Sequence, residues 1–184
     1  NELLNFINSI TRGGDREMID MWVLYKQYHY LPETNGSNSI KFVLPAIMNK
    51  FENFNQVFKY SIYGKKELIK SLNFDSIAWI KKDKDGNVCD PYKMLPKVFK
   101  DYEKDQLDLI YGDNELKNGG SAMIAYAVCQ FTKISDIERK KLEKALLRYC
   151  ELDTFAMVII YLYWIEKVYK VDSLIKYKGN YKVA

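Results

Sequence analysis

The chain has 184 residues, of which 48% are hydrophobic and 28% are charged, and its net charge is +4. This length and composition fit one folded domain with a buried core, and they exclude a disordered or collagen-like chain. The longest apolar run, residues 155–165, is shorter than the roughly 20 residues that a membrane helix needs, so no membrane span is expected. The small positive charge permits nucleic-acid binding without indicating it.

The N-terminal residues contain neither a basic leader nor an initiator methionine, which favours a mature, cytoplasmic chain cut from a longer polypeptide. The three cysteines, Cys89, Cys129 and Cys150, are too far apart for a disulfide framework or a zinc site, so we expect reduced thiols. His29, the only histidine, has no partner at a recognisable spacing and is interpreted as a solvent or core residue.

The first fifty residues predict two helices and an ambiguous segment. Apolar residues recur at helical spacing over 3–10, before Gly13 and Gly14 break the pattern. Residues 18–25 suit a buried strand or a strand-to-helix passage, with a helix as the alternative. After a turn at 35–37, Ser37 or Ser39 can cap a helix over 40–49, which Pro45 must bend or restart.

Residues 51–118 have no long period and predict an irregular insertion. Within it, residues 77–88 resemble a small hairpin around the polar turn 82–87. Asp90 and Pro91 are an N-cap and a first helical residue, so a short helix is expected as far as Leu95.

The last third predicts helices. Ser121 is the natural cap of an apolar stretch over 122–131, and Ser135 with Glu138 forms a capping box before a helix that runs to about Tyr169. We expect a mainly α (α+β) fold with a few short strands, residues 1–170 as a single domain and residues 171–184 as a tail.

Asp153 is the residue whose position most needs a chemical explanation. It opens an almost wholly apolar helical stretch, where a carboxylate is partly desolvated unless a cation or a donor meets it. An outward-facing or capping aspartate is the alternative. Tyr149, four residues earlier, lies on the same helical face. Tyr-x-x-x-Asp is the spacing found in one branch of the DEDD exonucleases.

The sequence around this pair resembles a known family in several blocks that occur in the same order. Residues 147–158 resemble the C-terminal block of bacterial domain-of-unknown-function family 2779, an RNase H-like relative of the DEDD exonucleases. Further blocks of resemblance are residues 19–22, 36–41, 43–46, 90–93 and 119–126, so that the likeness spans about residues 18–165.

The resemblance implies a C-terminal part of a metal-dependent 3′–5′ exonuclease-like domain that acts on DNA or RNA. Asp153 would be the last of four acidic ligands to a pair of Mg²⁺ or Mn²⁺ ions, and Tyr149 would orient the attacking water. The family's first acidic motifs should lie upstream of this chain, so the upstream part of the same polypeptide is an expected partner and this fragment alone is expected to be inactive. Asp20 matches a scaffold position and is a further candidate metal ligand.

Basic and aromatic residues could also contact a single strand by charge and stacking, although solvated lysines and a core tryptophan explain them equally well. The alternative function is a non-catalytic structural or binding module with the same fold. The candidate nucleic-acid contacts are Lys41, Lys65, Lys66, Trp79, Lys81 and Lys82.

Overall fold

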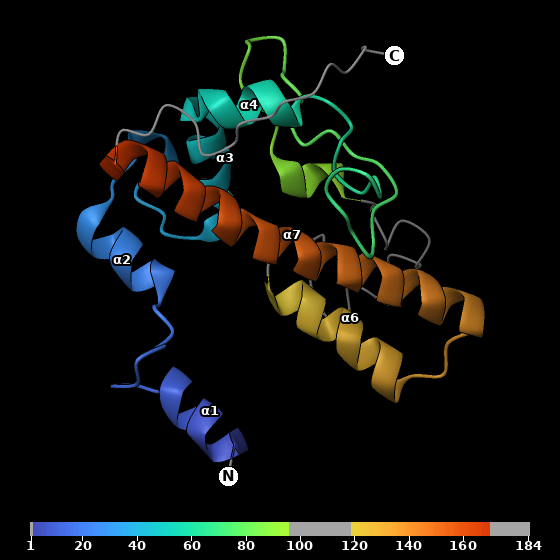
Figure 1. Cartoon of the computed structure of the whole chain (residues 1–184). Coiled ribbons are helices and arrows are strands. Elements are labelled where there is room, and N and C mark those ends of the chain that lie inside the picture. The colour runs from blue at the N-terminus through green and yellow to red at the C-terminus, as the bar shows by residue number, and fades with distance from the viewer. Residues whose placement is uncertain (1, 96–118, 170–184) are drawn as a thin grey trace.

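The computed structural model describes residues 2–95 and 119–169, and this part of the chain is mainly α-helical (Figure 1), as predicted. Extended pairing within these ranges is limited to three isolated bridges, Tyr63 with Ile69, Tyr63 with Ile77 and Lys82 with Val88. The elements are α1 (Glu2–Ile10), α2 (Met21–Tyr28), the 3₁₀ turn η1 (Pro32–Thr34), α3 (Ile40–Lys50), α4 (Glu52–Phe58), the 3₁₀ turn η2 (Pro91–Met94), α6 (Gly119–Phe131) and α7 (Asp136–Tyr169).

The long helix α7 organises the described structure (Figure 1). It has 34 residues and packs against α3 along its C-terminal half and against α6 along its N-terminal half. A large core joins α3, α4, the segment before η2 and α7, and a small second core joins α6 to α7. Fully buried members of the large core include Leu44, Ile47, Met48, Phe54, Trp79, Leu152 and Ile159.

Helix α7 begins at the predicted capping box. The Glu138 carboxylate accepts hydrogen bonds from the Ser135 N–H at 2.9 Å and from its hydroxyl at 2.7 Å, and the Ser135 hydroxyl accepts one from the Glu138 N–H at 3.3 Å. The helix then continues to Tyr169 without a break, as predicted. Asp153 therefore lies in mid-helix, where the apolar stretch begins, and the alternative that it caps a new helix is wrong.

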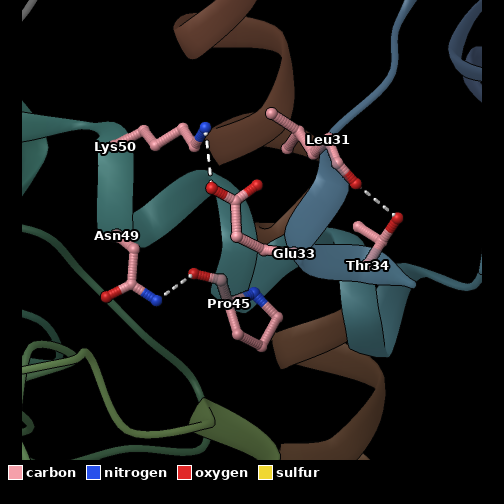
Figure 2. Close-up of polar contacts among 6 residues, drawn as sticks. All are labelled: Leu31, Glu33, Thr34, Pro45, Asn49 and Lys50. Atoms are coloured by element: carbon pink, nitrogen blue, oxygen red, sulfur yellow. Dashed lines mark hydrogen bonds and ion pairs between the residues drawn. The ribbon is translucent and has the colours of Figure 1, made fainter. Parts of the chain in front are cut away.

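Helix α3 is continuous through Pro45, so of the two alternatives, a bend or a restart at Pro45, the restart is wrong. Ser39 occupies the N-cap position without a capping hydrogen bond from its side chain. The Asn49 side chain donates to the Pro45 carbonyl at 3.0 Å (Figure 2) and accepts from the Val88 N–H at 2.7 Å, which links α3 to the last residue of the hairpin. At its C-terminal end, Lys50 pairs with Glu33 of η1 at 2.8 Å (Figure 2).

Helix α2 replaces the strand that we considered for residues 18–25. The Asp20 carboxylate accepts hydrogen bonds from the N–H groups of Trp22 (2.9 Å) and Val23 (3.4 Å), which caps a helix start at Met21. Trp22 and Val23 are exposed, so the apolar run is not a buried strand. The predicted first helix is confirmed as α1, although none of its residues is buried.

Within the segment predicted as an irregular insertion, at about residues 51–118, the first residues form helix α4. Residues 60–90 are irregular, and the predicted hairpin is confirmed by the bridge between Lys82 and Val88. The predicted short helix after Asp90 is the 3₁₀ turn η2. Residues 96–118 and the predicted tail at 171–184 lie outside the described residues.

Helix α6 begins at Gly119, so the predicted cap Ser121 lies inside it. Cys89, Cys129 and Cys150 are free thiols. His29 is partly buried, between our two alternatives of a solvent and a core residue, and its ring centroid lies 5.3 to 6.0 Å from those of Tyr25, Tyr163 and Trp164. Within residues 2–95 and 119–169, no helix is long and apolar enough to cross a bilayer.

Candidate functional site

Asp153 lies in a polar cluster that joins the middle of α7 to η2. The Tyr92 hydroxyl donates a hydrogen bond of 2.5 Å to Oδ1 of Asp153, across 61 residues of sequence. Tyr149 is one turn before Asp153, and its ring lies beside the Tyr92 ring with centroids 5.9 Å apart. The predicted common face of Tyr149 and Asp153 is thus present, and Tyr92 is a third member of the cluster.

Local sequence explains how Tyr92 reaches α7. Asp90 caps η2 by accepting a hydrogen bond from the Tyr92 N–H at 2.9 Å, and Pro91 fixes the first backbone angle of the turn. Pro91 is itself buried. The turn therefore has a defined position, from which the Tyr92 ring extends toward the carboxylate on α7.

Lys41 completes the cluster from the first turn of α3. Its Nζ lies 5.2 Å from the centroid of the Tyr92 ring and 5.1 Å from that of Tyr149, within the range of a cation–π contact. The half-buried ammonium loses hydration, which lowers its pKa, while the charges of Asp153 and Asp90 act in the opposite direction. Lys41, predicted here as a nucleic-acid contact, is in fact beside the predicted catalytic pair.

The two phenols of the cluster are neutral hydrogen-bonding groups. Burial, followed by the charge and hydrogen bonding of Asp153, raises the pKa of Tyr149 to about 12. Burial and the hydrogen bond to Asp153 raise the pKa of Tyr92 far above its ordinary value. Both hydroxyls therefore keep their protons at neutral pH, and each can take part in hydrogen bonds.

A second polar cluster lies close by on α7, around Glu151. The Glu151 carboxylate accepts hydrogen bonds from the Tyr63 hydroxyl at 2.7 Å and from the Asn73 amide at 2.6 Å, and Arg148 Nε donates to the Asn73 carbonyl at 2.8 Å. Burial raises the pKa of Glu151, but hydrogen bonds, including one from Ser71, outweigh it and lower the pKa overall. Through these hydrogen bonds, the irregular segment at residues 60–90 is linked to α7.

The structure does not bring Asp20 to Asp153. Asp20 caps α2, and the next residue, Met21, lines a groove together with Trp164 and Val168 near the end of α7. At 1.5 Å per residue, Asp153 and Trp164 are separated along the helix by roughly 17 Å. Asp20 has a capping role in this structure, and its role as a metal ligand has no geometric support.

The remaining predicted nucleic-acid residues differ in exposure. Lys65, Lys66, Lys81 and Lys82 are exposed, and their contact with a strand stays a prediction. Trp79 is 1% exposed and packs edge-on against Tyr63 and Phe74, so its ring is not presented to a base. This placement matches the alternative of a core tryptophan.

Tyr92 is the site residue that our sequence reasoning did not select. The sequence indicated the position of Tyr92 only indirectly, since the Asp90–Pro91 cap predicts a fixed turn but not the element against which the turn packs. Nowhere in the described ranges do three or more histidine, cysteine, aspartate or glutamate side chains form a group that could hold a metal ion.

Comparisons of the chain with known protein families, curated proteins and solved structures find no match. The resemblance to family 2779 therefore stays a prediction, and the properties of the site have to be argued from its own residues.

Proposed function

We propose that the chain is the C-terminal part of a metal-dependent 3′–5′ exonuclease-like domain, of RNase H-like fold, that acts on DNA or RNA in the cytoplasm. The observation that carries this proposal is the common face of Tyr149 and Asp153 on α7, where the carboxylate is partly buried within a cluster of titratable groups. A partly buried carboxylate has to be met by donors or cations, and a group of polar side chains of this kind is a candidate for a functional site.

The described residues would supply one part of a metal site. The Asp153 carboxylate is a suitable oxygen ligand for Mg²⁺ or Mn²⁺. Its neighbours are two neutral phenols and an ammonium, so they do not by themselves fit a pair of divalent ions. Further acidic ligands would come from the upstream part of the polypeptide, and the bound ions would supply activation of water and stabilisation of the leaving oxygen.

Each residue of the cluster would then have a separate task. Asp153 would supply a formal negative charge, and the Tyr92 hydroxyl would hold one of its oxygens in a fixed direction. Tyr149, whose proton stays in place, would hydrogen-bond to the attacking water and orient it. The role proposed for Tyr149 is therefore positioning of the water and not removal of its proton.

One observation favours the alternative of a non-catalytic binding module. The Tyr92 hydroxyl already donates a hydrogen bond to Asp153, and the Asp153 charge acts favourably on Lys41, as expected of a polar contact that only joins α3, η2 and α7. The two functions differ in what the loss of the Asp153 charge does to turnover.

The test uses a labelled oligonucleotide and the polypeptide that carries this chain together with its upstream acidic motifs. Asp153→Asn should abolish metal-dependent cleavage, and Tyr149→Phe should slow it by about 10²-fold or less, as expected for the loss of one positioning hydrogen bond. Tyr126→Phe, on the exposed face of α6, is the matched control and should cleave normally. The 184-residue chain alone should not cleave. Normal cleavage by Asp153→Asn would exclude the exonuclease function and leave the binding module.

A further inference from the structure

Helix α1 carries an apolar face that stays exposed in the described structure. Its apolar side chains recur at spacings of three and four residues and form one stripe along the helix: Leu3, Phe6, Ile7 and Ile10. Leu3 is 71% exposed and Ile7 is 40% exposed, and none of the residues of α1 is buried. A continuous apolar surface of this kind is typical of a contact with another protein surface.

An apolar groove of about 480 Å³ lies between α2 and the C-terminal end of α7. Met21 and Leu24 line it from α2, and a set of α7 side chains between residues 161 and 169 lines it from the other side. Among these α7 residues, Val168 is 72% exposed. The groove therefore presents apolar side chains of two helices to the outside.

The stripe on α1 and the groove match in length and in chemistry. The α7 wall of the groove extends over residues 161–169, roughly 12 Å at 1.5 Å per residue, and the nine residues of α1 extend over roughly 14 Å. Apolar residues at i, i+3, i+4 and i+7 are the anchors by which an amphipathic helix binds in an apolar groove. A helix with the stripe of α1 is thus a suitable occupant.

The loop after α1 holds this helix away from the groove of its own chain. The Arg16 N–H donates to the Ser9 carbonyl at 2.8 Å and the Gly14 N–H donates to the Thr11 carbonyl at 2.9 Å, so the chain turns back tightly against the end of α1. A Cβ atom at Gly14 would lie 2.3 Å from the Ser9 carbonyl oxygen, so this turn requires glycine. Helix α1 projects past α2, away from the C-terminal end of α7 (Figure 1), and the residues that line the groove lie outside α1.

We propose that the groove binds α1 of a second copy of this chain, and that two copies exchange these helices reciprocally. The stripe and the groove then meet twice about a twofold axis, as in the symmetric interfaces of most homodimers. Each stripe and each groove offers about 300–400 Å² of apolar surface, so the four surfaces together bury about 1,200–1,600 Å², which is the size of a stable interface. This dimer does not depend on the role of Asp153.

The test is sedimentation equilibrium of the 184-residue chain over a range of micromolar concentrations. The mass of the wild type should rise from 21.7 kDa toward twice that value. Ile7→Asp on the stripe and Val168→Asp in the groove should each weaken dimerisation by about tenfold or more, because an unpaired charge in an apolar contact is costly. Asn5→Asp is the matched control, since it adds the same charge on the opposite face of α1, and it should dimerise normally.

Both test positions are exposed in the single chain, so each variant should keep the helical content of the wild type by circular dichroism. A mixture of the two variants locates the contact. The intact α1 of Val168→Asp can enter the intact groove of Ile7→Asp, so the mixture should associate more strongly than either variant alone. An equal mixture that associates no better than the separate variants would show that stripe and groove do not meet, and the proposal would be wrong.

Other occupants give different results. A wild-type chain that stays at 21.7 kDa at every concentration overturns the proposal, and a monomer that both Ile7→Asp and Val168→Asp destabilise would place α1 in its own groove instead. A dimer that Ile7→Asp weakens but Val168→Asp leaves unchanged would mean that two α1 helices pair with each other. Each of these outcomes excludes the reciprocal exchange.

Discussion

Replacing Tyr92 by phenylalanine tests the cluster around Asp153 with the smallest possible change. The substitution keeps the ring and its packing beside Tyr149, but it removes the hydroxyl that donates a hydrogen bond of 2.5 Å to the Asp153 carboxylate. A hydrogen bond to a charged group contributes about 1.5–3 kcal/mol to stability. Because Lys41 remains beside Asp153 and Tyr92 is only partly buried, we expect the lower half of that range, about 1.5–2 kcal/mol.

The assay is urea unfolding followed by far-ultraviolet circular dichroism at pH 7, together with a thermal melt. For a chain of this size, the expected loss corresponds to a fall in Tm of about 3–8 °C. Tyr28→Phe is the matched control, since Tyr28 is 80% exposed, and its free energy of unfolding should stay within about 0.5 kcal/mol of the wild type. If Tyr92→Phe unfolds like Tyr28→Phe, the hydrogen bond to Asp153 does not stabilise the fold and the cluster is organised differently in solution.

Two further substitutions test other parts of the structure. Glu151→Gln should be less stable than the wild type at pH 6, because a lowered pKa in the folded state means that the ionised carboxylate stabilises the fold above the ordinary pKa of 4.5. The difference in the free energy of unfolding should shrink as the pH falls below that value. A difference that stays constant in urea titrations from pH 6 to pH 3 would contradict this. Ser135→Ala should lower the free energy of unfolding by about 0.5–2 kcal/mol through loss of the capping box, whereas Ser39→Ala, whose side chain makes no capping hydrogen bond, should be close to neutral in the same melts.

Signals that act over a few residues were sufficient to predict several elements. The capping box at Ser135, the Asp90–Pro91 turn and the hairpin around residues 82–87 depend on hydrogen bonds between near neighbours in the chain, and all three are present in the structure. The helical spacing of four residues also correctly predicts that Tyr149 and Asp153 lie on one face of α7. The secondary structure of residues 18–25 was harder to predict, because a short apolar run fits a strand or a helix until its cap is known.

The surroundings of Asp153 depended on tertiary structure. Sequence alone predicted that a donor or a cation meets this carboxylate, with an outward-facing or capping aspartate as the alternative, because a desolvated charge without a partner is costly. It could not identify Tyr92 or Lys41 as those partners, since they are separated from Asp153 by 61 and by more than 100 residues and reach it only when η2 and α3 pack on α7. Chain packing, and not local propensity, therefore decides which groups surround the candidate catalytic residue.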